Sequence, residues 1–216
     1  MAVRLPNGAT IAIASAYGAS KAMSAVSNAN PAVATLEASH GVVLNDILEV
    51  TSGWSGLNSR IIRAGTVSTN DVQLAGFNST STASFPAAGG TGSVREISTW
   101  QQITQVLDTG TAGGEQQFVT YSFLESDAEF QIPTVKSPSS LSLTIGDDAS
   151  LAHYAVLDAA DSDRLPRAIR VSLPGGSVIY YNCYVTLNRT PTLTKNQLMG
   201  LQVTLSQLAE ATRYAS

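Results

Sequence analysis

The sequence predicts a mainly β protein: a β-sandwich or barrel with one flanking α-helix and a small inserted β module. Along much of the chain, apolar residues alternate with polar ones, which is typical of strands that are buried on one face. Clusters of Gly, Pro, Asn, Asp and Ser separate these runs. A single stretch, Ala149–Ala160, has the length and the Ala and Leu content of a helix and contains no Gly or Pro.

The chain is long enough for one large β domain that carries an insertion. Its 216 residues are 44% hydrophobic, which is sufficient for a core of ordinary size. We therefore expect a single domain over residues 1–216. A small β module is expected at about residues 28–94, near the N-terminus, because short apolar pieces there alternate with Gly, Asn, Asp and Ser turns.

Within this module, the tract Asn78–Gly92 consists almost wholly of Ser, Thr, Ala and Gly around the pair Phe85-Pro86. Such a composition offers little apolar surface with which to order the segment. Its length also exceeds that of most loops in compact domains. We therefore expect an extended loop that orders against a neighbouring molecule.

The segment Ile97–Leu107 fits two structures. The apolar residues Ile97, Trp100 and Ile103 are spaced as in a helical stripe, whereas the Thr, Ile and Val content favours a strand. We predict a strand. Further strands are indicated by the alternating residues Val119, Tyr121 and Phe123, and by Leu141, Leu143 and Ile145.

The helix and a β-hairpin follow. Asp147 and Asp148 place negative charge where the helical run begins, which stabilises a helix N-terminus. In the C-terminal third, alternating residues 169–173 lead into the turn Pro174-Gly175-Gly176, and the alternation continues over residues 179–187. A last half-buried strand is indicated by Met199, Leu201, Val203 and Leu205.

The low charge of the chain is the first functional clue. Charged residues make up 13% of the sequence, whereas about 25% is usual for soluble proteins. We infer that much of the surface is buried against copies of the same chain, although a low-charge enzyme with a Ser- and Thr-rich surface has the same composition. The net charge is −4, and no basic run offers tight binding to phosphates.

The sequence predicts neither a bound cofactor nor a membrane-spanning segment. Cys183 is the only cysteine, so neither a disulfide framework nor a Cys-rich zinc site is expected. The N-terminus lacks an apolar signal region, and no window approaches the roughly 18 apolar residues of a membrane span. We expect a soluble protein that is made in a reducing cytoplasm and is not exported.

No catalytic constellation is evident. The segment Gly53–Gly56 lacks the spacing of a nucleophile elbow, and the glycines of Gly90–Gly92 do not follow a buried strand. His40 and His153 lie far apart, and each is expected in a turn or on a helix surface. Asp158, Asp161 and Asp163 lie close together in the sequence. They indicate either a loop that attracts a cation or, as we expect, a solvated turn after the helix.

Three other carboxylates, Glu125, Asp127 and Glu129, alternate along a predicted strand face. They are consistent with a paired-carboxylate glycosidase site, with an ordinary solvated face, or with the wall of a channel that repels phosphates. The residues alone do not decide among these interpretations.

Several short motifs are shared with a known family. They include the hairpin residues 169–187, Thr190-Pro191-Thr192-Leu193, Trp100-Gln101-Gln102-Ile103, Gly113-Gly114-Glu115, Ile132-Pro133-Thr134, Asn28–Val33 and Ser52–Arg60. With these motifs, the chain resembles the major tail tube proteins of long-tailed, siphovirus-type bacteriophages. The resemblance covers most of the chain.

The resemblance implies a tail-tube fold, a β-sandwich flanked by a helix, and no active site. Six copies are expected to close into a ring, and rings are expected to stack into a tube that conducts viral DNA without binding it specifically. Further expected partners are the tape-measure, tail terminator and tail tip proteins. The protein would be located in the virion tail after synthesis in the host bacterial cytoplasm.

Under this hypothesis, the channel-lining candidates are Glu125, Asp127 and Glu129. The candidates for contacts between rings are Asn78, Phe85, Pro86 and Gly92, together with the segment Ala2–Asn30. An alternative is a carbohydrate- or host-binding β module of a phage tail, either a tip or a decoration protein. That alternative requires an exposed aromatic platform, for which the candidates are Tyr180, Tyr181 and Tyr184.

Overall fold

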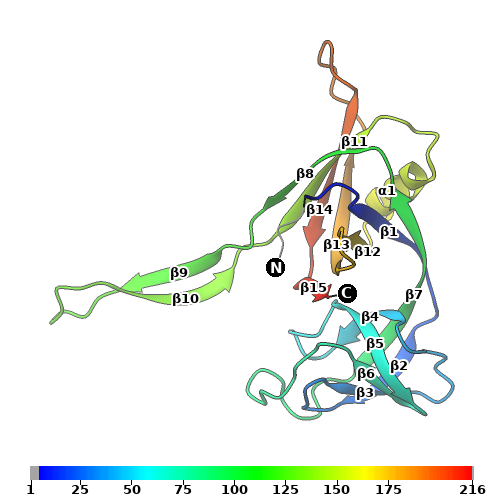
Figure 1. Cartoon of the computed structure of the whole chain (residues 1–216). Coiled ribbons are helices and arrows are strands. Elements are labelled where there is room, and N and C mark those ends of the chain that lie inside the picture. The colour runs from blue at the N-terminus through cyan, green and yellow to red at the C-terminus, as the bar shows by residue number, and fades with distance from the viewer. Residues whose placement is uncertain (1–4, 216) are drawn as a thin grey trace.

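The computed structural model describes residues 5–215, and almost all of its regular structure is β-strand (Figure 1). The predicted contact segment Ala2–Asn30 therefore lies partly outside the described residues. Two bodies share the long strand β7, Gly92–Ile103. The mainly β fold class that the sequence predicts is confirmed.

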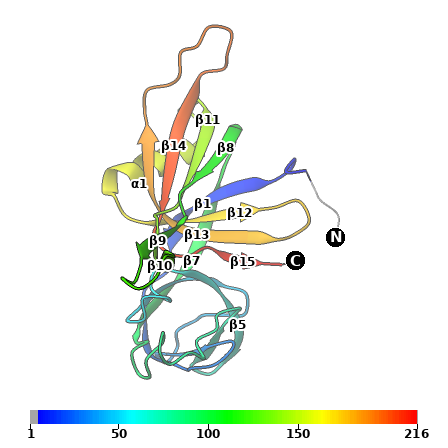
Figure 2. The same ribbon diagram turned by 90° about the vertical axis from the view of Figure 1, so that its left-hand side faces the viewer.

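The first body is a closed antiparallel barrel. Its other strands are β2 (Lys21–Val26), β3 (Val33–Leu36), β4 (Ile47–Ser52), β5 (Ile61–Ser68) and β6 (Asp71–Leu74). Hydrogen-bonded neighbours follow the order β2-β3-β6-β5-β4-β7, and pairing of β2 with β7 closes the circle. Figure 2 views this body nearly end-on. The barrel encloses a core of its own around Trp54, Leu48 and Leu57.

The second body is a strongly curved antiparallel sheet in the order β7-β1-β12-β13-β14-β11-β8. Its strands are β1 (Thr10–Tyr17), β8 (Val106–Ala112), β11 (Ser140–Gly146), β12 (Arg167–Ser172), β13 (Val178–Asn188) and β14 (Gly200–Gln207), and the short β15 (Thr212–Tyr214) pairs with the start of β13. The predicted C-terminal hairpin is β12 and β13. The segment Ile97–Leu107 is extended, as expected, and belongs to β7 and β8.

One face of this sheet forms the main core. On β11, Leu141, Leu143 and Ile145 are buried, while the Ser and Thr residues between them are half-exposed. The helix α1 (Ala152–Asp163) packs against β13, β7 and β1 and buries Leu157 and Ala160. The sheet and the helix therefore share one apolar core.

The helix begins three residues later than the sequence indicates. The carboxylate of Asp148 accepts hydrogen bonds from the backbone and hydroxyl of Ser150, which also lower the pKa of Asp148. This local turn competes with helical backbone geometry, so α1 begins at Ala152. Asp147 and Asp148 therefore precede the helix, and its first turn holds no acidic residue.

A polar network joins the two bodies. Glu49 on β4 is 7% exposed; its carboxylate pairs with Arg95 at 2.5 Å and accepts a hydrogen bond from Asn182 Nδ2 at 3.0 Å. On the C-terminal strand β15, the Tyr214 hydroxyl accepts a hydrogen bond from Arg63 N and donates one to Ala75 O. These contacts hold the barrel against the sheet.

Removal of the buried carboxylate in Glu49→Ala is expected to lower the free energy of unfolding by about 2 kcal/mol, because Arg95 loses its ion-pair partner and Asn182 keeps only its hydrogen bond to Ser59 O. Urea unfolding of the unassembled subunit measures this loss. The matched control is Glu115→Ala, at an exposed carboxylate, which is expected to change stability by less than about 0.5 kcal/mol. Equal stability of the two variants would refute the role of the network.

Candidate assembly surface

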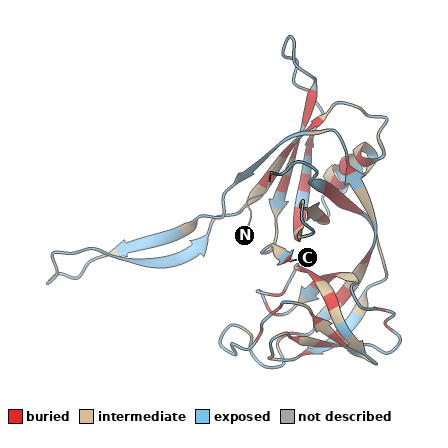
Figure 3. Cartoon of the chain, viewed as in Figure 1, coloured by how far each residue is buried: buried red, intermediate tan, exposed pale blue. Residues whose placement is uncertain are grey.

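A two-stranded arm projects from the sheet. Its strands are β9 (Gln116–Tyr121) and β10 (Phe130–Lys136), which pair only with each other among the described residues (Figure 1). Nearly the whole arm is exposed (Figure 3). Its large apolar side chains, each at least 43% exposed, are Phe118, Val119, Phe123, Leu124, Phe130, Ile132 and Val135. An isolated hairpin is at best marginally stable in water, so this arm needs a partner surface.

The strand register gathers much of this apolar surface on one face. Tyr121 lies opposite Phe130, and Val119 lies opposite Ile132. The ring centroids of Tyr121 and Phe130 are 5.6 Å apart, and Phe123 meets Tyr121 edge-on at 5.4 Å. Cross-strand pairs of this kind stabilise a ribbon. The arm therefore presents a preformed apolar stripe.

The base of the arm requires glycine. Gly113 has φ +76°, and a Cβ built there would lie 1.9 Å from the carbonyl oxygen of Pro138. Next to it, Ser137 N donates to Glu115 O at 2.8 Å and Ser137 Oγ accepts from Glu115 N at 2.9 Å. The two connections between sheet and arm are thereby held together where the chain leaves β8.

The tip of the arm corrects one sequence prediction. β9 ends at Tyr121, and a turn between Phe123 and Ser126 follows, closed by a 3.1 Å backbone hydrogen bond. Glu125, Asp127 and Glu129 therefore occupy the loop at the tip. The prediction that they alternate along a strand face is wrong, because the backbone reverses direction there. All three are exposed and form no ion pair within the described residues.

Strand β8 provides a second unpartnered feature. It lies at the end of the strand order and pairs only with β11 among the described strands. Every side chain from Leu107 to Ala112 is exposed. A free edge of this length offers a row of backbone donors and acceptors to another strand. The sheet can therefore be extended from β8.

The tract Asn78–Gly92 is ordered by its own barrel. Ser79 is fully buried, and Asn28 Nδ2 donates to the carbonyls of Ser79 and Phe85 at 2.9 and 2.8 Å. Trp54 Nε1 donates to Pro86 O at 2.8 Å, and the rings of Trp54 and Phe85 pack edge-on. The prediction that this tract orders only against a neighbour is therefore wrong. A few long-range hydrogen bonds replace the apolar surface that it lacks.

The four candidate contact residues of this tract differ in setting. Asn78 and Pro86 are exposed, Phe85 is half-buried, and Gly92 lies in β7. A Cβ at Gly92 would lie 2.0 Å from Thr51 O, so strand packing within the barrel already explains this glycine. Asn78 and Pro86 are the members whose side chains are free to meet another molecule.

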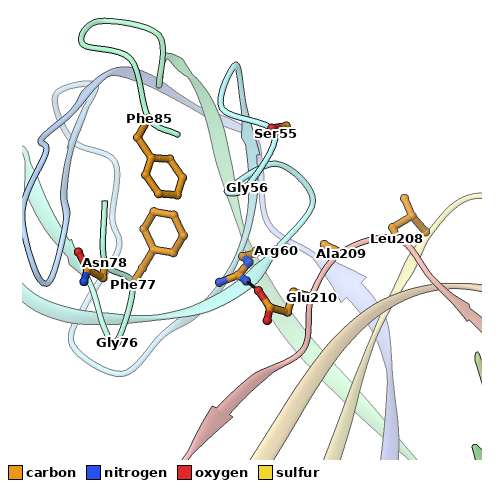
Figure 4. Close-up of a pocket in the computed structure, with 10 residues that line it drawn as sticks. All are labelled: Ser55, Gly56, Arg60, Gly76, Phe77, Asn78, Phe85, Leu208, Ala209 and Glu210. Atoms are coloured by element: carbon orange, nitrogen blue, oxygen red, sulfur yellow. Dashed lines mark hydrogen bonds and ion pairs between the residues drawn. The ribbon is translucent and has the colours of Figure 1, made fainter. Parts of the chain in front are cut away.

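A cleft of 570 Å³ lies between this barrel and the segment that precedes β15 (Figure 4). Phe77 and Phe85 line its barrel side, and an ion pair between Arg60 and Glu210 crosses it. Glu210 is the only acidic residue in the lining, which contains neither His nor Cys. The cleft therefore lacks a nucleophile with a base beside it.

Both histidines are buried. His40 directly follows a turn, near the position that the sequence predicts, whereas His153 lies on α1 but not on its exposed surface, contrary to the prediction. His40 Nδ1 accepts a hydrogen bond from Val42 N, and its Nε2 lies 3.0 Å from Thr69 O. His153 lies on the inner side of α1, with Nδ1 3.5 Å from Thr104 N. Burial lowers the pKa of His153. Each ring therefore serves the packing of its own body.

The lowered pKa of His153 predicts that the protein becomes less stable as the pH is lowered. The unfolded chain takes up a proton near the ordinary value of 6.5, whereas the folded chain takes it up only at lower pH. The contribution of the neutral ring is thus complete above about pH 6.5 and decreases below it. Urea unfolding between pH 7.5 and 5.5 should show a smaller loss for His153→Gln than for the unaltered protein. Identical losses would contradict this prediction.

The acidic residues of α1 are paired with arginines. Arg189 contacts Asp158 at 2.7 Å and Asp161 at 3.5 Å, and Arg167 pairs with Asp163. All three aspartates lie on the helix α1, so the prediction that they lie in a loop or turn after the helix is wrong. Within the described part of the chain, no group of His, Cys, Asp and Glu residues is arranged to hold a metal ion, and no helix is long and apolar enough to cross a membrane.

The aromatic platform required by the carbohydrate-binding alternative is not formed. Tyr180 is buried against Tyr214 and Trp100, and Tyr181 is half-buried on the opposite face of β13. Tyr184 alone is exposed. The alternation of side chains along β13 places Tyr181 on the face opposite Tyr180 and Tyr184, and burial of Tyr180 leaves Tyr184 without a second exposed ring beside it.

Comparison with known proteins identifies a family for this chain. The family model for "Phage tail tube protein, TTP" matches residues 52–216. No curated protein matches the chain. The similar solved structures include the virion of a native gene transfer agent particle, with 11% identity and a TM-score of 0.43, covering 54% of this chain and 89% of that one. The tail of an empty gene transfer agent particle has 12% identity and a TM-score of 0.43, covering 54% and 87%.

A third similar structure is the tube-terminating cap of the anti-feeding prophage, with 16% identity and a TM-score of 0.36, covering 54% of this chain and 83% of that one. The family model alone decides the classification, because it matches well over half of the chain. The chain belongs to the phage tail tube protein family.

Proposed function

We propose that the protein is a non-enzymatic subunit whose copies close into hexameric rings, and that these rings stack into a tail tube that conducts viral DNA into the host. The observation that carries this proposal is the arm β9–β10. It offers a preformed apolar stripe that no described part of its own chain covers. Membership of the tail tube family supports a second copy of the chain as its partner.

The arm fits a head-to-tail contact. It reaches away from both bodies (Figure 1), so the surface that receives it lies on a different molecule. A contact between two different surfaces of the same chain produces a closed ring or an open stack, depending on the rotation between copies. Either product is a component of a tube.

The free edge of β8 fits ring closure. The sheet layer β8-β11-β14-β13 has this edge at one side, and at the other side β13 pairs with β12 only as far as Cys183. A neighbouring copy placed beside β8 would continue the layer from subunit to subunit and remove the exposed edge. We propose six copies in such a ring.

The outer barrel supplies the proposed contacts between rings. Asn78 and Pro86 remain candidates because their side chains are exposed on a loop that the barrel holds in place. Phe85 and Gly92 would support that loop from within. We treat the barrel as an insertion in a single tail-tube domain. Further proposed partners are the tape-measure, terminator and tip proteins of the tail, and the virion is the proposed location after synthesis in the host cytoplasm.

Negative-stain electron microscopy tests this function directly. The purified chain is concentrated and, in a parallel sample, mixed with tail tip complexes that initiate assembly. Hollow, regularly banded tubes are expected in at least the second sample. Dispersed monomers in both samples would contradict the proposal.

A further inference from the structure

The exposed face of the layer β8-β11-β14-β13 has an unusual chemistry. The strand registers align its outward side chains in three rows of four. From one end of the layer to the other, these rows are Ala112, Ser140, Ser206 and Tyr184; then Gly110, Ser142, Thr204 and Thr186; then Asp108, Thr144, Gln202 and Asn188. We call this surface the polar grid. The opposite face of β11, β14 and β13 belongs to the apolar core.

The polar grid is almost free of charge. Of its twelve side chains, Asp108 alone is charged, and none is Lys or Arg. None is an aliphatic group larger than that of Ala112. Every member is exposed or half-exposed. The grid therefore consists of small hydroxyl, amide and glycine positions, with Tyr184 at one corner.

This chemistry excludes the two ordinary uses of a sheet face. Sheets pack face to face through interdigitating apolar side chains, and the grid has too few of these to form a second core. Tight binding to nucleic acid relies on Lys and Arg neutralising the phosphates, and the grid offers neither. A surface without apolar contacts and without cations suits a polyanion that passes without being held.

We infer that the polar grid, and not the acidic tip of the arm, lines the channel of the tube, where it faces double-stranded DNA. This inference rests on the proposed function and assigns its channel surface. The free edge of β8 borders the grid, so a neighbouring copy added there would extend the same surface around a ring. Each grid hydroxyl forms weak hydrogen bonds that water replaces at once, so no position retards the passing phosphates.

Cysteine labelling of assembled tubes tests this assignment. Ser206→Cys places a thiol on the exposed grid, and Ser68→Cys, at the exposed end of β5 in the barrel, is the matched control. The native Cys183 is 1% exposed, and burial raises its pKa to about 12, so it contributes little background. Two reagents are compared: a small maleimide that enters the channel, and a maleimide on a polymer too large to enter.

In tubes, Ser206→Cys is expected to react with the small reagent. Its reaction with the large reagent is expected to be at least tenfold slower in tubes than in the free subunit. Ser68→Cys is expected to react with both reagents. Rapid reaction of Ser206→Cys in tubes with the large reagent would place the grid outside, and no reaction with the small one would place it in a subunit interface. Either result overturns the inference while the tubes themselves uphold the proposed function.

Failure of the unaltered chain to form tubes would overturn the function and this inference together. If Ser206→Cys alone prevents assembly, Ser142→Cys on the neighbouring strand reports on the same surface. The same two outcomes then decide the assignment.

Discussion

A subunit that lacks the arm, residues 115–137, is expected to fold normally and to form no tubes. β8 and β11 are already paired, with Ala112 opposite Ser140, so a short loop suffices to join them. No arm residue belongs to a buried core cluster. The free energy of unfolding should therefore change little, by about 1 kcal/mol or less. Assembly should be lost because the apolar stripe is gone, as electron microscopy would show.

A pair of double variants separates the stripe from the length of the arm. Val119→Ser with Ile132→Ser changes the apolar face, whereas Thr120→Ser with Gln131→Ser changes the opposite face of the same strands. The first variant is expected to prevent tube formation and the second to allow it. Equal assembly of the two would show that the stripe is not the contact surface.

Lysine in the polar grid is expected to block DNA passage without preventing assembly. Thr204→Lys adds one cation per subunit at a half-exposed hydroxyl position and so a circle of cations in every ring of the proposed tube. Each cation attracts phosphates, and the attraction repeats along the channel. Particles carrying this variant should eject DNA about tenfold more slowly or worse, and the defect should weaken as salt rises.

The control for this charge is Ser68→Lys, which adds the same cation on the barrel. Ejection of DNA is measured in particles of normal tail length, so an assembly defect is not mistaken for slow transit. Normal ejection from Thr204→Lys particles would contradict the channel assignment. A slow rate in both variants would indicate an effect of net charge alone.

Local pattern predicts the parts of this fold that are buried within one chain. The alternation of Leu141, Leu143 and Ile145 corresponds to β11, and the Pro174-Gly175-Gly176 turn does join two paired strands. The barrel closes through pairing of β2 with β7, which are far apart in sequence. Period-2 alternation identifies a strand but does not identify its partner, so this closure was not predictable.

The arm shows the limit of such patterns most clearly. Val119 and Tyr121 alternate like residues of a half-buried strand, yet the arm stands outside the core of its own chain. Alternation indicates that a face is meant for burial but not which molecule buries it. The predicted strand also ends too late, because no Gly or Pro marks the reversal between Tyr121 and Phe130.

The burial of His40 and the ordering of the Ser-rich tract have one cause. His40 and Ser79 are polar residues buried by specific long-range hydrogen bonds, which hydropathy cannot reveal. The three acidic residues at the tip of the arm are a different case. Their charge makes Glu125, Asp127 and Glu129 candidates for a channel wall, whereas the polar grid, which we propose for the channel, carries only one charged residue across four strands.

The central claim is that the arm and the polar grid together build a tube from copies of this chain. A helical cryo-electron microscopy reconstruction of assembled tubes tests it most directly. The account predicts six copies per ring, with Val119 and Ile132 buried against another copy and Ser142, Thr204 and Thr186 facing the channel. Arms that project freely into solvent, with the polar grid on the outer surface, would contradict it.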